Sequence, residues 1–199
     1  METIFLIDTS KSMEGERVGQ LNHVMLEILT RLENFSENTK ENVYVRVVNF
    51  DNVARFFIGR ATQSIRVDKA YDMWHNLIAK GATDTAHAVR LCKKSIESDY
   101  ANMKYDKTVA ILVTDGKSSD EEDFNDAISE MKESLSKMKE KSIFFASIGV
   151  FDYDGKELEA FADLNNVCKT KYSKRNSESV YRADDIYKLN DIMKKILED

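Results

Sequence analysis

The sequence predicts an α/β fold in which a central sheet of buried strands is covered by helices. Short runs of Val, Ile, Leu and Phe alternate along the chain with longer segments of helical periodicity. This alternation is typical of sheets whose strands are joined by helices. The runs are also nearly continuous in apolar residues, as expected for strands that are covered on both faces.

Each element follows from its own pattern. Arg17 to Phe35 carries apolar residues at three- and four-residue steps, which predicts a covering helix. Asp51-Asn52 separates two β-type runs, which predicts a hairpin whose second arm is an edge strand. The four central strands are expected over residues 3–7, 43–50, 108–114 and 142–150. Further helices are expected over residues 83–98, 121–141, 155–164 and 185–197, and a last short strand over 179–182. Residues 63–80 give no clear pattern, and 165–178 are expected to form an exposed loop or an edge insertion.

Length and composition limit the class of protein. With 199 residues and 42% hydrophobic residues, the chain suffices for one core but not for two linked domains, so we expect residues 1–199 to form a single domain. No apolar run approaches the roughly 18 residues of a membrane span, and the N-terminus lacks a signal peptide's pattern. Two cysteines, Cys92 and Cys168, suggest no disulfide framework. We therefore expect a cytoplasmic protein with no membrane partner.

Charge argues against nucleic acid as a partner. The net charge is -6, from 35 acidic and 29 basic residues that are scattered along the chain. No basic stripe is present to collect phosphates.

Oxygen-bearing side chains gather after the predicted strands. The first strand runs into Asp8-Thr9-Ser10-Lys11-Ser12, a later one ends in Thr114-Asp115-Gly116, and Gly81-Ala82-Thr83 precedes a helix. Ligands of open parallel sheets bind beyond the carboxyl ends of the strands. Two carboxylates and several hydroxyls suit Mg²⁺ or Mn²⁺ and do not suit Zn²⁺ or copper. Because few of these ligands are charged, the ion would keep a position open for a carboxylate from a partner protein.

These three segments together resemble the metal-ion-dependent adhesion site of von Willebrand factor A-type domains. The resemblance covers essentially the whole chain and implies a doubly wound, Rossmann-like, mostly parallel six-stranded sheet with one antiparallel edge strand and helices on both faces. It implies that Ser10, Ser12 and Thr83 supply hydroxyl ligands, while Asp8 and Asp115 act directly or through water. It also implies a protein-binding module that is not an enzyme and that captures a partner's Glu or Asp through the metal.

The short form that starts at Met1 is similar to bacterial intracellular A-type proteins such as the tellurium-resistance-associated group. Two positions depart from the family's pattern. Lys11 stands where the family usually has Gly, and Ala82 replaces the second Gly of Gly-Gly-Thr. A lysine beside the ion either swings into solvent or lowers the affinity for the cation by like charge, so metal affinity is left open.

Other interpretations compete with the metal site. The same side chains could simply cap two helices and open a turn. Asp8 could be the nucleophile of an Mg²⁺-dependent phosphohydrolase, although Ser10 stands where such enzymes have a second Asp. In a third interpretation, Lys11 disables the site and leaves a metal-free scaffold. Outside these segments, Cys168 is the more reactive candidate thiol because it lies in a basic stretch.

Overall fold

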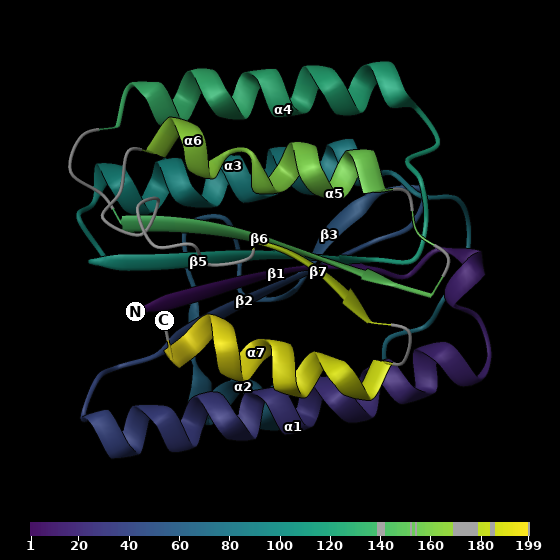
Figure 1. The fold of residues 1–199 in the computed structure, drawn as a ribbon. Coiled ribbons are helices and arrows are strands. Elements are labelled where there is room, and N and C mark those ends of the chain that lie inside the picture. Colours follow the sequence, from purple (N-terminus) through teal and green to yellow (C-terminus); the bar gives the residue numbers. More distant parts are fainter. Residues whose placement is uncertain (139–141, 152, 154, 169–178, 184–185, 199) are drawn as a thin grey trace.

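The computed structural model describes residues 1–138, 142–151, 153, 155–168, 179–183 and 186–198. A sheet runs through its centre in the strand order β3-β2-β1-β5-β6-β7 (Figure 1). The strands of this path are β1 (Glu2–Asp8), β2 (Tyr44–Phe50), β3 (Ala54–Ile58), β5 (Lys107–Thr114), β6 (Ser142–Val150) and β7 (Val180–Ala183). A seventh strand of two residues, β4 (Ile65–Arg66), also pairs with β2.

The pairing confirms the mostly parallel sheet. β1 is parallel to both β2 and β5, and β5, β6 and β7 follow in parallel order. β3 is antiparallel to β2, as the Asp51-Asn52 turn predicts. The chain extends the sheet first from β1 toward β3 and then from β5 toward β7, so the order reverses between β1 and β5. Ligands of doubly wound sheets bind at this reversal, beside the carboxyl ends of the strands.

Helices cover both faces of the sheet (Figure 1). One face carries α1 (Glu16–Thr39), α2 (Val67–Met73) and α7 (Leu189–Glu198). The other face carries α3 (Thr85–Ala101), α4 (Glu121–Ser136), α5 (Gly155–Ala162) and α6 (Asn165–Cys168). Short 3-10 turns over Lys11–Met13 and Ile186–Lys188 precede α1 and α7. None of the helices in the described ranges is long and apolar enough to cross a membrane.

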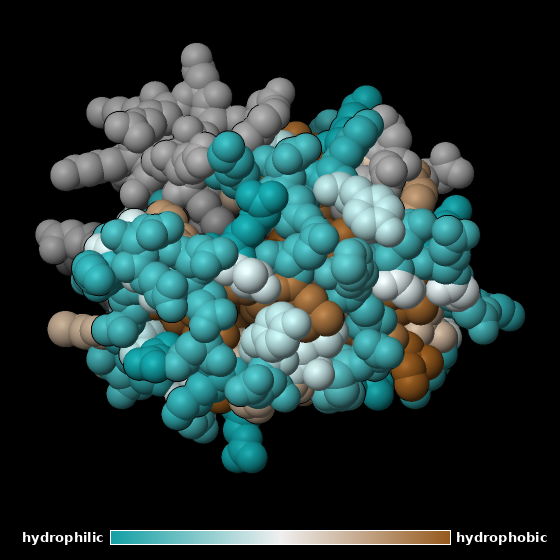
Figure 2. Space-filling model, turned by 90° about the horizontal axis from the view of Figure 1, so that it is seen from below, coloured by the Kyte–Doolittle hydropathy of each residue, from teal (hydrophilic) through white to brown (hydrophobic). Residues whose placement is uncertain are grey.

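The core is divided by the sheet into two apolar layers. On β1, Phe5 and Ile7 pack into the layer with α1, while Ile4 and Leu6 pack into the layer with α3 and α4. This alternation follows from the two-residue repeat of a strand, which turns successive side chains to opposite faces. Figure 2 shows the outer surface on the α1, α2 and α7 side as mostly hydrophilic, with smaller hydrophobic areas between the polar side chains.

A buried ionic cluster lies at the opposite end of the sheet from the carboxyl end of β1. Arg46 of β2 is fully buried and donates to Asp99 of α3 at 2.6 and 3.0 Å and also to Glu2 of β1. Burial raises the pKa of Glu2 to about 9. Burial also opposes the ionisation of Asp99, but hydrogen bonds from Arg46 and Glu2 hold its pKa below the usual range. Asp99 is therefore the charged partner of Arg46.

The expected elements agree with the structure except at their ends and in two regions. The helix expected over residues 121–141 is α4, which ends at Ser136. The last three residues of the expected range, 139–141, lie outside the described part. Residues 63–80, for which the sequence gives no clear pattern, contain β4 and α2. Of the expected loop over 165–178, residues 165–168 form the short helix α6 and 169–178 lie outside the described residues.

Candidate metal centre

Asp8, the last residue of β1, lies at the centre of the candidate site. Its side chain is buried, with the residue only 1% exposed. One carboxylate oxygen accepts a hydrogen bond from the backbone N–H of Ser10 at 2.8 Å, and the other accepts from the Thr114 hydroxyl at 2.6 Å. Because Thr114 ends β5, these two bonds join the loops that follow the two central strands.

The two serines connect this loop to Asp115. The hydroxyl oxygens of Ser10 and Ser12 are 2.9 Å apart, and the Ser12 hydroxyl donates to Asp115 Oδ1 at 2.7 Å. Four of the five residues expected from the sequence, Asp8, Ser10, Ser12 and Asp115, therefore form one hydrogen-bonded group, which Asp8 joins through the Ser10 backbone N–H. These residues come from two loops that are more than 100 positions apart in the chain, since the Ser12–Asp115 pair alone is separated by 103 positions.

Thr83, the fifth residue, lies in a third loop that is fastened to the other two. The N–H of Lys11 donates to the Gly81 carbonyl at 3.0 Å, which ties this loop to the loop after β1. The N–H of Ser119 donates to the Thr83 carbonyl at 2.8 Å, which ties it to the loop after β5. A Cβ atom at Gly116 would lie 3.8 Å from the Thr83 hydroxyl oxygen, so this hydroxyl lies next to the residue that follows Asp115.

Gly81 requires a glycine for two reasons. Its φ is +74°, a conformation that side chains with a Cβ rarely adopt. A Cβ there would also lie 2.8 Å from the Asn52 side chain. Asn52 in turn accepts from the Ala82 N–H at 2.6 Å, so the close approach of the β2–β3 turn fixes the loop that carries Thr83.

Helix capping does not account for these side chains. The residue that precedes α1 is Gly15, and Ser10 makes no capping bond to the 3-10 turn that it precedes. At α3 the capping residue is Asp84, whose carboxylate accepts from the His87 N–H at 2.9 Å. Thr83 therefore stays outside the helix.

The arrangement fits a hard divalent cation. Among the described residues, Asp8 has no basic side chain as a hydrogen-bond partner. Burial raises its pKa to about 6, although the bonds from Thr114 and Ser10 lower it. A cation beside Asp8 would offset that cost of burying its charge. In the described part of the chain, no three His, Cys, Asp or Glu side chains come together as metal ligands. Any cation at this place would therefore depend on the hydroxyls as well as the two carboxylates, the donor chemistry that suits Mg²⁺ or Mn²⁺.

Arg17 of α1 is a neighbour of the site that the sequence analysis missed. Its Nη1 donates to Asp115 Oδ2 at 3.1 Å and to the Ser12 carbonyl at 3.2 Å. Its guanidinium also lies over the ring of Phe151, 4.3 Å from the centroid. No motif marks this arginine, because it lies on a helix and its acidic partner is 98 positions away. Lys11, by contrast, is exposed, and it contacts the site through its backbone N–H, which donates to the Gly81 carbonyl.

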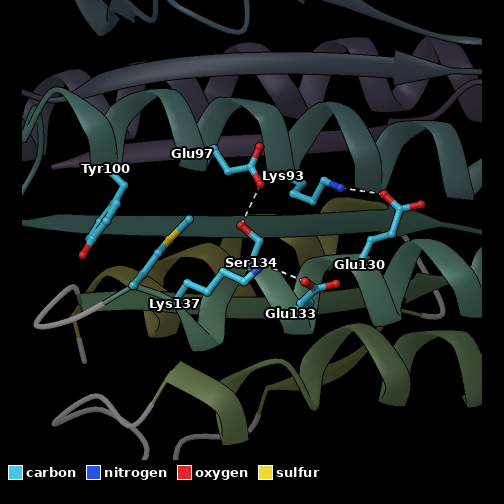
Figure 3. A pocket seen from close by; sticks show the side chains of 8 residues that line it. Lys93, Glu97, Tyr100, Glu130, Glu133, Ser134 and Lys137 are labelled. Carbon is cyan, nitrogen blue, oxygen red and sulfur yellow. Dashed lines mark hydrogen bonds and ion pairs between the residues drawn. The ribbon is translucent and has the colours of Figure 1, made fainter.

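Two other features have no part in this site. Burial raises the pKa of Cys168 to about 12, which disfavours its thiolate, and the basic residues that follow it lie outside the described part of the chain. A groove of about 320 Å³ lies between the C-terminal halves of α3 and α4 (Figure 3). These halves lie away from the loops that follow β1 and β5 (Figure 1). The groove's polar side chains bond one another: Lys93 pairs with Glu130, Lys137 pairs with Glu133, and the Ser134 hydroxyl donates to Glu97.

Comparison with solved structures supports the fold. A von Willebrand factor type A protein from Catenulispora acidiphila matches with a TM-score of 0.71 and 19% identity over 98% of this chain and 41% of that chain. The protein BatB from Bacteroides thetaiotaomicron matches with a TM-score of 0.65 and 16% identity over 100% of this chain and 98% of that chain.

A third structure carries a metal. Proximal thread matrix protein 1 from the mussel byssus, with zinc in its metal-ion-dependent adhesion motif, matches with a TM-score of 0.63 and 19% identity over 99% of this chain and 44% of that chain. Our chain thus spans less than half the length of this protein and of the Catenulispora protein. None of the curated proteins compared with the chain matches it.

The family model of the von Willebrand factor type A domain matches residues 3–195. This family is known for metal-dependent interactions between proteins, and its domains are typically interaction modules rather than enzymes. With nearly the whole chain matched, the protein belongs to the von Willebrand factor type A domain family.

Proposed function

We propose that residues 1–199 form one interaction module that captures an acidic side chain of a partner protein through a divalent cation. The cation, Mg²⁺ or Mn²⁺, would be held by Asp8, Ser10, Ser12, Thr83 and Asp115. The observation that carries this proposal is the hydrogen-bonded group of Asp8, Ser10, Ser12 and Asp115 at the reversal of the sheet. The side chains of this group offer only oxygen atoms as metal ligands, and helix capping does not explain their arrangement.

The charges of the site favour a carboxylate as the ligand. Two acidic residues only balance the charge of a divalent cation, and hydroxyl ligands add none. The cation therefore stays attractive to an oxygen anion from outside. Glu or Asp of a partner protein supplies such an oxygen. We further propose that the protein works in the cytoplasm, as the bacterial intracellular members it resembles do; its two cysteines, both unpaired, are compatible with a reducing compartment.

Calorimetric titration of the chelator-treated protein with Mg²⁺, Mn²⁺ and Zn²⁺ tests the metal. We expect about one Mg²⁺ or Mn²⁺ per chain and loss of binding in Asp115→Asn. Asp126→Asn is the matched control, because Asp126 is exposed on α4. Zn²⁺ belongs in the series because the mussel protein holds zinc in its motif. Unchanged Mg²⁺ binding in both Asp115→Asn and Asp8→Asn would contradict the proposal.

The competing interpretations give different results in the same samples. A metal-free scaffold would bind no ion up to millimolar concentration, and its melting temperature would not respond to a chelator. A phosphohydrolase would turn over an aryl phosphate and lose this activity in Asp8→Asn. The position of Asp8 does not favour that activity, because a nucleophile must reach the substrate directly and this residue is 1% exposed, whereas a cation can be held through an intervening water.

A further inference from the structure

A guanidinium lies at the edge of the candidate metal centre. The side chain of Arg17 is 40% exposed, while the Asp115 side chain that it contacts is 1% exposed. Arg17 makes two hydrogen bonds to described residues, one to Asp115 and one to the Ser12 carbonyl, and both come from Nη1. A guanidinium carries five N–H donors, so Nε and Nη2 remain available to a ligand that approaches from solvent.

The orientation of this guanidinium is fixed from a second side by Phe151. Its ring lies under the guanidinium, 4.3 Å from ring centroid to Cζ, and packs partly against the core on the α1 side of the sheet. Phe151 has a φ of +58°, which is unfavourable for a residue with a Cβ. Its N–H donates to the Ala183 carbonyl at the end of β7 at 3.2 Å, so the ring position is anchored in the sheet. Arg17 is thus held in place before any ligand arrives.

The charge of Arg17 affects a cation and an anion in opposite directions. Asp8, Asp115 and Arg17 together carry one net negative charge, and a divalent cation would change this to one net positive charge. Without Arg17 the loaded site would be neutral. Arg17 therefore repels the cation and attracts the anion that follows it.

We propose that Arg17 is a specificity-determining residue for the acidic ligand, which it contacts with its free N–H groups while the cation holds another ligand oxygen. This inference rests on the proposed function, because it assigns the second half of the same carboxylate-binding site. The planar guanidinium directs its N–H groups at the remaining carboxylate oxygen in a fixed geometry, which the rotating ammonium of a lysine does not. The ligand is thus recognised as a carboxylate, because a neutral amide oxygen would gain only an uncharged acceptor's weaker hydrogen bond from Arg17.

The test uses Mg²⁺ and acetate as probes on the full chain. Mg²⁺ affinity is measured by calorimetry in potassium chloride and in potassium acetate at equal ionic strength. Arg17→Gln removes the charge, and Arg17→Lys keeps the charge without the planar fork. Arg31→Gln is the matched control, because Arg31 is exposed on the same helix, 14 residues further along, which places it roughly 21 Å away. Comparison within each buffer cancels the chelation of free Mg²⁺ by acetate.

Opposite shifts are expected in the two buffers. In chloride, Arg17→Gln should bind Mg²⁺ about threefold more tightly than wild type, the scale of one partly exposed charge contact. In acetate, wild type and Arg31→Gln should gain Mg²⁺ affinity relative to Arg17→Gln. Arg17→Lys should keep the wild-type affinity in chloride and lose most of the gain from acetate. A general loss of structure would weaken binding in both buffers, and circular dichroism would detect it.

Two negative results have different meanings. If Arg17→Gln binds Mg²⁺ like wild type in both buffers, the role of Arg17 is refuted and the metal site stands. If wild type and Arg17→Gln bind neither Mg²⁺ nor Mn²⁺, the proposed function is refuted and this inference with it.

Discussion

Replacement of Asn22 by alanine should destabilise the protein and loosen the segment that leads to the Thr83 loop. Asn22 is a buried residue of α1. Its Nδ2 donates to the Leu77 carbonyl at 3.0 Å and to the Val18 carbonyl at 2.8 Å, and its Oδ1 accepts from the Leu77 N–H at 2.7 Å. Three residues after Leu77, the N–H of Lys80 donates to the Thr9 carbonyl in the loop after β1. The amide thus fastens α1 to the candidate site.

The size of the effect follows from the groups that lose their partners. In Asn22→Ala, both backbone groups of Leu77 lose their side-chain partner at a place where Leu77 is 3% exposed. Each buried polar group without a partner costs about 1–3 kcal/mol. Partial entry of water reduces this cost, so we expect the free energy of unfolding to fall by about 3 kcal/mol.

Urea unfolding followed by far-UV circular dichroism measures this loss. Gln20→Ala is the matched control, because its side chain bonds Glu16 on the exposed surface of the same helix, and its cost should stay below about 0.5 kcal/mol. The Mg²⁺ affinity of Asn22→Ala should also fall, since Thr83 is less firmly held. A loss of under about 1 kcal/mol in Asn22→Ala would refute the argument that this amide holds the segment.

Three further predictions concern buried charge and backbone conformation. Asp99→Asn should lower the free energy of unfolding by about 3–5 kcal/mol, because it leaves Arg46 buried without its charged partner. Glu2→Gln should cost much less, because Glu2 is protonated at neutral pH. Urea unfolding of both variants at pH 7 tests this difference. Folding raises the pKa of Glu2 from 4.5 to about 9, so the free energy of unfolding should fall as pH rises through that interval. The fall should be less steep in Glu2→Gln than in wild type, and urea titrations at pH 6 and 9 measure it. Gly81→Ala should weaken Mg²⁺ binding in calorimetry and cost more stability than Gly15→Ala, because both have positive φ but a Cβ meets other atoms only at Gly81.

Results against these three predictions would be equally specific. Equal losses in Asp99→Asn and Glu2→Gln would mean that the two acids share the charge of the arginine. A Glu2→Gln slope as steep as that of wild type would assign the pH dependence to other groups. Equal costs at the two glycines would mean that the β2–β3 turn yields to the added methyl group.

The central sheet was predictable because burial leaves a simple pattern in the sequence. A strand covered on both faces admits few polar residues. The apolar runs in the sequence accordingly predict the ends of β1, β5 and β6 to within about one residue. β4 is too short for a pattern, since a strand of two residues has no period to detect. Helix α2 of seven residues is similarly short.

Residues of the candidate site were predictable to lie together where they follow or end strands, and not where they depend on distant contacts. Asp8 and Thr114 each close a central strand, so their neighbours had to meet at the same edge of the sheet. Arg17 and Asn22 are single polar residues on α1, and their partners lie in other loops. Nothing local distinguishes them from polar residues that face solvent on the same helix.

The two departures from the family's glycine pattern fall where the structure does not need glycine. Neither Lys11 nor Ala82 has a positive φ, unlike Gly81 beside them. Both take part in the site through the backbone, Lys11 as a donor to the Gly81 carbonyl and Ala82 as a donor to Asn52. A side chain at these positions therefore leaves the loop geometry intact. Because the Lys11 side chain is exposed and the Arg17 guanidinium contacts Asp115, Lys11→Gly should change the Mg²⁺ affinity less than Arg17→Gln. If calorimetry shows a larger effect for Lys11→Gly than for Arg17→Gln, then Lys11 and not Arg17 supplies the positive charge that acts on the cation.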